Sequence, residues 1–386
     1  MMKIIIAPDS FKESLSAMAV ATCIEKGFSE IFPDSEYIKV PLADGGEGTV
    51  EVLVDALNGQ RQHQAVHGPI SGNVDAVWAL LEEEKAKTAL IEIAAASGLD
   101  LITPEQRDPL RATSFGTGQS ILHALDAGVS KILIGLGGSA TNDGGAGILQ
   151  ALGGRLLDGQ GNELALGGAA LAELAEIDLT GLDKRCAGVE FIVACDVSNP
   201  LIGENGASAI FGPQKGATPD TVKLLDNALS NFAEVVEKKT GINHKQSVGF
   251  GAAGGAPLGL SLAFNIEIKP GIDMVLDILK VNEQLEDADL VISGEGMMDN
   301  QTLNGKTPFG IAKRAAARNI PVISIAGSLG TEVDALYQTM DSIFGTVRSP
   351  QTLSQVLSEA EVNLTRTARN IAATLLIGTK IQSRVI

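Results

Sequence analysis

The chain has 386 residues, of which 45% are hydrophobic and 20% charged, and this composition excludes a disordered, collagen-like or coiled-coil protein. Its 29 basic and 47 acidic residues give a net charge of −18. Such a charge repels phosphate backbones and anionic membranes, so we expect neither nucleic acid nor a membrane as a partner. The 44 glycines follow no fixed period, and we expect many of them at turns where the backbone approaches a ligand.

Cysteine content and hydropathy indicate the compartment. Cys23, Cys186 and Cys195 are too few, and odd in number, for a disulfide framework, which favours a reducing environment. The apolar run Ile4–Ala7 is too short for a signal peptide, and no stretch approaches the roughly 18 apolar residues of a spanning helix. We therefore expect a cytoplasmic protein.

Short apolar runs alternate with amphipathic helices at both ends of the chain. The first 60 residues predict strands at Ile4–Ala7 and Tyr37–Leu42 and helices at Ser16–Phe32 and Gly48–Leu57. From residue 286 onward, the pattern predicts strands at Leu290–Ser293, Val322–Ala326 and Ile343–Val347. It predicts helices at Thr307–Arg318, Glu332–Gln338 and Ser354–Ile381. This alternation predicts a parallel sheet with helices on both faces.

The middle of the chain has a different pattern. Alternating residues at Val74–Leu80, a charged turn and the run Thr88–Ala94 predict a hairpin. Further strands are expected at Lys131–Leu136 and Glu190–Ala194, and helices at Gly116–Ala127 and Asp220–Lys239. We predict an α/β protein of two domains. Residues 1–60 and 286–386 would form a discontinuous, flavodoxin-like doubly wound sheet, and residues 61–285 an inserted mixed α/β domain.

Ligands of open parallel sheets bind at the carboxyl ends of the strands, so the residues after each predicted strand are the first candidates. The predicted strand Lys131–Leu136 is followed by a glycine-rich loop with hydroxyl and carboxylate side chains. The loop residues that we assign to phosphate or substrate binding are Gly137, Gly138, Ser139, Thr141, Asn142 and Asp143. Such a loop can present N–H groups to an anion. It can also be an ordinary tight connection between strand and helix.

Carboxylates at strand ends suit Mg²⁺, which takes one or two of them together with phosphate oxygens and water. Asp44 and Glu295 are the leading candidates for metal ligands, and Glu47, Asp196 and Asp299 are further ones. The alternative is that these side chains cap helices or are solvated acids in a first turn.

Two segments resemble nucleotide-binding motifs. Gly135, Gly137 and Ala140 fit a dinucleotide fingerprint with Asp158 about 20 residues on, but residues 142–145 interrupt the helix that should follow. The segment Asn300–Thr307 resembles a phosphate-binding loop without its first glycine, and its Lys306 can reach a phosphate. Among the other basic residues, Arg107 is the candidate for a carboxylate, since a guanidinium binds one bidentately. Lys215 lies in a second glycine-containing segment.

Several blocks of the sequence together resemble the bacterial glycerate kinase family, of the ATP-dependent glycerate 2-kinase type. The blocks are Ala7–Ser16, Asp44–Thr49, Gly137–Gly145, Ala194–Pro200, Phe211–Gly216 and Gly294–Gly296. The resemblance covers nearly the whole chain and implies a two-domain α/β kinase that uses ATP and Mg²⁺ on D-glycerate. The family usually has a basic residue after Gly294–Gly296, where this chain has Met297.

Phosphoryl transfer depends on positioning and charge neutralisation. We place the reaction in a cleft between the two domains, with Asp196 as the base for the substrate hydroxyl and Asp9 as the second choice. Lys12 and Lys215 would neutralise the transferring group. Three alternatives remain: a kinase of another small hydroxy acid, a nicotinamide-dependent dehydrogenase, and a non-catalytic protein that binds small anions.

Overall fold

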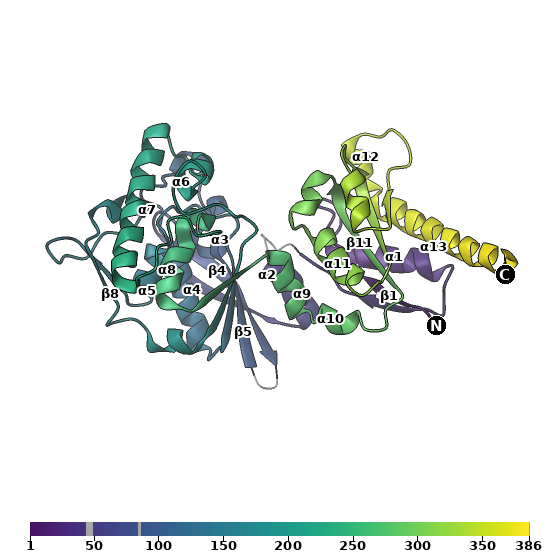
Figure 1. The fold of residues 1–386 in the computed structure, drawn as a ribbon, viewed down its shortest axis with the longest axis horizontal. Helices are drawn as coiled ribbons and strands as arrows, with labels where there is room; N and C mark the ends of the chain where they lie inside the picture. Colours follow the sequence, from purple (N-terminus) through teal and green to yellow (C-terminus); the bar gives the residue numbers. More distant parts are fainter. Residues whose placement is uncertain (44–48, 84–85, 386) are drawn as a thin grey trace. The chain divides into compact units, whose positions relative to one another are not determined.

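The computed structural model describes residues 1–43, 49–83 and 86–385 and divides into two compact units (Figure 1). Unit one comprises residues 1–44 and 272–386, and unit two comprises residues 45–271. These limits differ from the domain limits inferred from the sequence, for two packing reasons. Helix α2 (Thr49–Leu57) packs against strands of unit two, whereas Ile272 packs on Gly310 and Asp273 bonds to Arg314, both in unit one.

Unit one is built on a five-stranded parallel sheet from both ends of the chain, purple and green to yellow in Figure 1. Its strands are β1 (Lys3–Ile6), β2 (Glu36–Lys39), β11 (Leu290–Met298), β12 (Val322–Leu329) and β13 (Ser342–Gly345). They lie in the order β13-β12-β11-β1-β2. This is the flavodoxin-like order, so the sequence prediction for this sheet is confirmed.

Helices cover both faces of this sheet. The successive residues Ile4, Ile5 and Ile6 have no exposed surface, and neighbouring side chains of a strand point to opposite faces. On one face, α1 (Ala17–Ser29) and α13 (Ala360–Val385) pack against Ile4 and Ile6. The predicted apolar stripe of α1 supplies Val20, Ile24 and Phe28 to this core. Helices α9 (Gly271–Ile278), α10 (Val281–Gln284), α11 (Thr307–Ala316) and α12 (Leu353–Ser358) complete the set.

Two strands and two helices of unit one differ clearly from the prediction. Strands β11 and β12 run on to Met298 and Leu329, because they continue to pair with each other beyond the ends of β1 and β13. Glu295 and Ser328 therefore lie within strands rather than after them. The predicted helix at Glu332–Gln338 is only a short 3₁₀ helix, η8 (Asp334–Gln338), and the last predicted helix is broken at Glu359 into α12 and α13.

Unit two holds a mixed six-stranded sheet in the order β10-β9-β6-β5-β4-β3. Its strands are β3 (Gln60–His67), β4 (Asn73–Glu83), β5 (Ala86–Glu92), β6 (Lys131–Gly135), β9 (Glu190–Ala194) and β10 (Ile266–Lys269), and a separate pair is β7 (Arg155–Leu157) with β8 (Glu176–Asp178). Its helices besides α2 are α3 (Ile93–Ser97), α4 (Phe115–Asp126), α5 (Ala146–Ala151), α6 (Ala207–Phe211), α7 (Pro219–Thr240) and α8 (Ala256–Ala263). The predicted hairpin is the antiparallel pair β4–β5, and β5, β6, β9 and β10 are parallel.

Two glycine-rich segments of unit two interlock. The Gly144 amide donates to the Gly254 carbonyl at 2.9 Å, and the Gly259 amide donates to the Gly144 carbonyl at 2.8 Å. Gly254 has φ +67°, and a Cβ there would overlap with the Thr141 carbonyl oxygen. These glycines therefore allow two backbone segments to pack together.

We expect Gly254→Ala to destabilise unit two by about 3 kcal/mol or more, because the alanine Cβ causes a steric overlap in addition to the cost of a positive φ. Gly128→Ala is the matched control, because Gly128 has φ +75° but no atom of the described residues lies within 4 Å of a Cβ placed there. It should cost about 1–2 kcal/mol. Urea unfolding compares the two variants, and equal losses of stability would contradict the proposed interlock.

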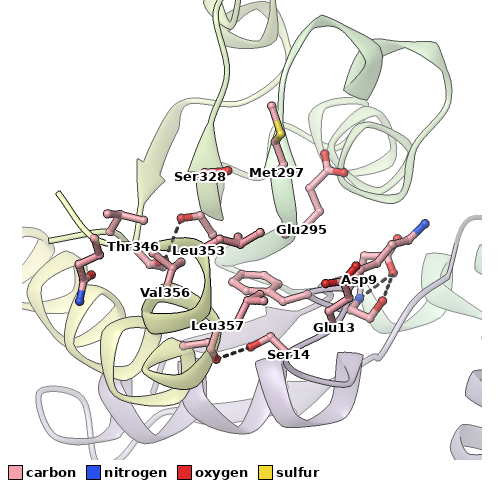
Figure 2. A pocket seen from close by; sticks show the side chains of 18 of the residues that line it. Asp9, Glu13, Ser14, Glu295, Met297, Ser328, Thr346, Leu353, Val356 and Leu357 are labelled. Carbon is pink, nitrogen blue, oxygen red and sulfur yellow. Dashed lines mark hydrogen bonds between the residues drawn. The ribbon is translucent and has the colours of Figure 1, made fainter. Parts of the chain in front are cut away.

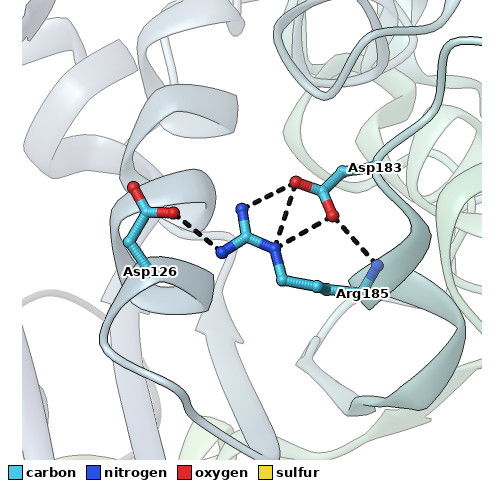
Figure 3. Close-up of polar contacts among 3 residues, drawn as sticks. All are labelled: Asp126, Asp183 and Arg185. Carbon is cyan, nitrogen blue, oxygen red and sulfur yellow. Dashed lines mark hydrogen bonds and ion pairs between the residues drawn. The ribbon is translucent and has the colours of Figure 1, made fainter.

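Part of the acidic excess forms solvated ion pairs. Arg185 bonds to Asp126 at 2.7 Å and to Asp183 at 2.7 Å (Figure 3). These carboxylates raise the pKa of the guanidinium. Its side chain is 45% exposed, so the pairs contribute little to stability. Within the described residues, the protein has no helix that is both long and apolar enough to cross a membrane.

Candidate functional site

A large pocket of about 880 Å³ lies in unit one, at the carboxyl ends of its parallel strands. Residues Asp9–Ser14 after β1, Glu295–Met297 of β11, Gly327 and Ser328 of β12 and Lys306 line it, as do several residues from Thr346 to Ala360. Figure 2 shows Asp9 and Glu295 on one side and Val356 and Leu357 of α12 on the other. One end of the pocket is therefore charged, whereas another wall is apolar.

Hydroxyl groups orient Asp9 and Glu295, two of the three carboxylates that line this large pocket, whereas the third, Glu13, is exposed. Asp9 accepts a hydrogen bond from the Thr307 hydroxyl at 2.7 Å and another from the Ser10 amide at 2.6 Å. Glu295 accepts from the Thr302 hydroxyl at 2.7 Å. These contacts fix oxygen atoms at the charged end. Thr302 lies in a short 3₁₀ helix within the motif-like segment Asn300–Thr307, where the sequence pattern pointed only to Lys306.

Glu295 is the most buried carboxylate of the large pocket. Burial raises its pKa, and the Thr302 hydroxyl and the Lys306 ammonium lower it in part. Lys306 Nζ lies 3.3 Å from Glu295 Oε2. Lys12 is exposed, and Met297 also lines the pocket with a 51% exposed side chain. The predicted residues Asp9, Lys12, Glu295 and Lys306 are thus brought together. The predicted metal ligand Asp44 lies outside the described residues, as does Glu47.

A small pocket of about 210 Å³ lies in unit two, beyond the carboxyl ends of β6 and β9. Residues 136–139 follow β6, and Cys195, Asp196 and Val197 follow β9. Gln214 and Lys215 come from the 3₁₀ helix η5 (Pro213–Lys215), and Phe211, Ala194, Ala252 and Ala253 complete the wall. Of the predicted residues, Gly137, Gly138, Ser139, Asp196 and Lys215 meet here.

Lys215 and Asp196 are the charged groups of the small pocket. The Lys215 side chain is only 2% exposed, and its Nζ donates to Ser139 Oγ at 3.0 Å and to the Thr141 carbonyl at 2.7 Å. Burial lowers the pKa of Lys215 to about 7, although the negative charge of Asp143 acts in the opposite direction. Asp196 is exposed, and its Oδ1 accepts from the Gly271 amide at 2.8 Å.

Asn142 and Asp143 lie behind the small pocket rather than in its wall. Asp143 is fully buried and accepts hydrogen bonds from the Ser114 amide and hydroxyl, both at 2.8 Å, and from the amides of Gly145 and Gly147. Burial raises the pKa of Asp143, and these bonds lower it. Asn142 Nδ2 donates to Ser208 Oγ at 2.9 Å. Both side chains therefore hold the loop in which Ser139 and Thr141 lie.

Arg107 does not line the small pocket, but it contacts Gln214, which does. Its Nη1 donates to the Gln214 carbonyl at 3.0 Å, directly before Lys215. Its Nε is buried and has no hydrogen-bond partner among the residues that the structure describes. The guanidinium thus supports η5. The contact of Arg107 with a substrate carboxylate stays a prediction.

The two motif resemblances do not have the geometry of nucleotide-binding loops. A dinucleotide fingerprint needs a helix directly after the strand, but β6 ends at Gly135 and α5 begins only at Ala146. The segment from Asn300 forms a 3₁₀ helix, η7 (Asn300–Asn304), before α11 begins at Thr307. Lys306 nevertheless lines the large pocket. The part of the chain that the structure describes holds no group of three His, Cys, Asp or Glu side chains that could bind a metal.

A flavodoxin-like unit and a mixed α/β unit, each with a charged pocket at the carboxyl ends of its strands, define an α/β enzyme of two units. The sequence profile of the glycerate kinase family matches residues 4–376. The chain therefore belongs to the glycerate kinase family, and it is a kinase that phosphorylates glycerate.

Named relatives and a solved structure agree with this assignment. Glycerate 2-kinase of Escherichia coli K12 is 51% identical over 378 residues, which cover 98% of this chain and 99% of that protein. Glycerate kinase of Bacillus subtilis 168 is 51% identical over 375 residues, with 97% and 98% covered. The crystal structure of a putative glycerate kinase 2 from Salmonella typhimurium LT2 is 52% identical, with a TM-score of 0.88 over 98% of this chain and 99% of that one.

Proposed function

We propose that the enzyme transfers the γ-phosphoryl group of ATP to O2 of D-glycerate and releases 2-phosphoglycerate and ADP. The observation that carries this proposal is the pair of pockets, about 880 and 210 Å³, because their sizes and chemistry suit the two reactants. The choice of O2 is supported by the name of the Escherichia coli relative, glycerate 2-kinase.

We assign the large pocket to ATP. The apolar wall with Val356 and Leu357 suits the adenine ring, and the charged end suits the phosphates. Lys12 and Lys306 line that end and can neutralise phosphate oxygens. Gly296 of β11 and Gly327 of β12 also line this pocket.

The carboxylates of the large pocket fit Mg²⁺, which prefers oxygen ligands and usually takes one or two carboxylates together with phosphates. Glu295 and Asp9 are the described residues that would hold it, and Asp44 stays a predicted ligand. When bound, the ion neutralises charge on the ATP phosphates. Thr302 and Thr307 keep the two carboxylates in place through their hydroxyl groups.

We assign the small pocket to D-glycerate, since its volume suits a three-carbon acid and excludes a nucleotide. Asp196 is the proposed base, and the backbone and hydroxyl of residues 137–139 are proposed donors to the substrate. The hydroxyl oxygen of glycerate forms a bond to the γ-phosphorus while the bond to ADP breaks, and Asp196 accepts the hydroxyl proton. This transfer requires the two bound reactants to meet during turnover.

We also propose a cytoplasmic location. Cys23, Cys186 and Cys195 are free thiols. Burial raises the pKa of all three, and that of Cys186 to about 11. Thiols of this kind are unreactive and typical of proteins in a reducing compartment.

The test of this function is ADP release with D-glycerate, ATP and Mg²⁺, followed by ³¹P NMR of the product. We expect ADP release to depend on D-glycerate and the product to be 2-phosphoglycerate. A product phosphorylated at O3 would contradict the assignment to O2, and faster turnover of another small hydroxy acid would contradict the assignment of the substrate.

For the large pocket, we expect Lys12→Met to raise the KM for ATP about tenfold, because one charge-assisted contact to a phosphate is lost. The KM for glycerate should stay within a factor of two or so. Lys12 is exposed, so the variant should fold normally. The matched control is Lys26→Met, which removes another exposed lysine of unit one. A change in the KM for glycerate alone would contradict the assignment of the pockets.

A further inference from the structure

Lys215 is the fully buried cation of the small pocket. Two of the three hydrogen positions on its Nζ point to oxygen atoms of the loop after β6, Ser139 Oγ and the Thr141 carbonyl. No third partner of Nζ is found in residues 1–43, 49–83 and 86–385. Because Lys215 lines the small pocket, the remaining position is available to a ligand there.

Neither of these two partners of Nζ is a carboxylate, and Lys215 forms no ion pair within the described ranges of the chain. The negative charge that acts on it is Asp143, whose carboxylate is bonded to Ser114, Gly145 and Gly147 instead. A buried ammonium without a partner is costly, and an anion in the pocket removes that cost. The protein thus holds a cation whose counter-ion is absent from its own described residues.

Several other groups surround Lys215. Asp143 lies in the loop after β6, whereas Asp196 and Cys195 follow β9 and line the same pocket. Arg107 bonds to the carbonyl of Gln214 from outside the pocket. Ala252 and Ala253, which line another part of the small pocket, carry no charge. Burial outweighs the negative charge of Asp143 and keeps the pKa of Lys215 at about 7.

We propose that Lys215 binds the carboxylate of D-glycerate in the small pocket, and that it takes up a proton when the acid binds. The inference rests on the proposed assignment of glycerate to this pocket. Free Lys215 is neutral in much of the population above pH 7, whereas a carboxylate at hydrogen-bond distance favours the charged ammonium. The carboxyl group of glycerate is ionised throughout this range, so the proton comes from solvent.

Calorimetric titration of the wild-type enzyme with D-glycerate, with and without ADP, tests this coupling. The titration is repeated between pH 6 and 8.5 in buffers of different ionisation enthalpy, which gives the number of protons bound per ligand. We expect little proton uptake at pH 6 and nearly one proton per glycerate at pH 8.5. The Kd should rise about tenfold per pH unit above pH 7.

Two variants separate Lys215 from its neighbours. Lys215→Met should abolish proton uptake and weaken glycerate binding about 10- to 100-fold at pH 6.5, with an affinity that no longer depends on pH. Asp196→Asn should keep the proton uptake, because Lys215 is unchanged. Thermal melting shows whether each variant is folded. The number of protons that the wild-type enzyme takes up per glycerate is measured independently of these variants.

The failures can be told apart. A wild-type enzyme that turns over D-glycerate but binds it without proton uptake overturns this inference alone. Proton uptake that persists in Lys215→Met assigns the effect to another group and also overturns it. Absence of glycerate-dependent ADP release overturns the proposed function, and the inference with it.

Discussion

Asp196→Asn should lower kcat by about two to four orders of magnitude, the range typical for loss of a general base. The glycerate hydroxyl must lose its proton as it attacks the phosphorus, and an amide cannot accept that proton. The exchange is mild for the fold, because the Asn oxygen can still accept the hydrogen bond that Gly271 donates to Asp196. Steady-state kinetics give kcat, and ADP titration gives nucleotide affinity, which should not change.

Glu204→Gln is a suitable control for this experiment. Glu204 is an exposed carboxylate of the same unit and lines neither pocket, so its variant should keep wild-type kinetics. A kcat of Asp196→Asn close to that of the wild type would reject Asp196 as the base. Asp9, our second choice, would then be tested in the same way.

Asp143→Ala should destabilise the enzyme by about 3–5 kcal/mol and abolish glycerate binding. The carboxylate accepts four hydrogen bonds from Ser114, Gly145 and Gly147 in a fully buried position. Its removal leaves these donors without partners, and the loop that positions Ser139 and Thr141 loses its anchor. Urea unfolding gives the loss of stability.

Asp100→Ala provides the comparison, since Asp100 is exposed and its variant should change stability by no more than about 0.5 kcal/mol. This experiment separates two roles of Asp143. The sequence suggested direct contact with substrate, whereas the buried hydrogen bonds indicate that it positions the loop. Loss of glycerate binding with a destabilisation below about 1 kcal/mol would favour direct contact.

The sheet of unit one was predictable because most of its strands are short apolar runs followed by a helical pattern, as in Ile4–Ala7 and Ser16–Phe32. Parallel strands place their carboxyl ends at one edge, and Asp9 and Glu295 accordingly line one pocket. Strand β3 (Gln60–His67) was missed because its residues are mostly polar and half-exposed.

Other features depend on contacts between distant segments. The length of β11 follows from its pairing with β12, and the burial of Asp143 follows from the close packing of the segments around Gly144 and Gly254. Neither the length of β11 nor the burial of Asp143 can be predicted from a local sequence pattern. The segment Asn300–Thr307 pointed to Lys306, but the contacts of its Thr302 and Thr307 hydroxyl groups with Glu295 and Asp9 depend in the same way on packing between separate segments.

The most direct test of the account is a crystal structure of the enzyme with D-glycerate and ADP, a pair that cannot react. We predict glycerate in the small pocket, with its carboxylate within hydrogen-bond distance of Lys215 Nζ and a hydroxyl beside Asp196, and ADP in the large pocket with its phosphates toward Lys12 and Lys306. Glycerate bound outside the small pocket, or without contact to Lys215, would contradict the account.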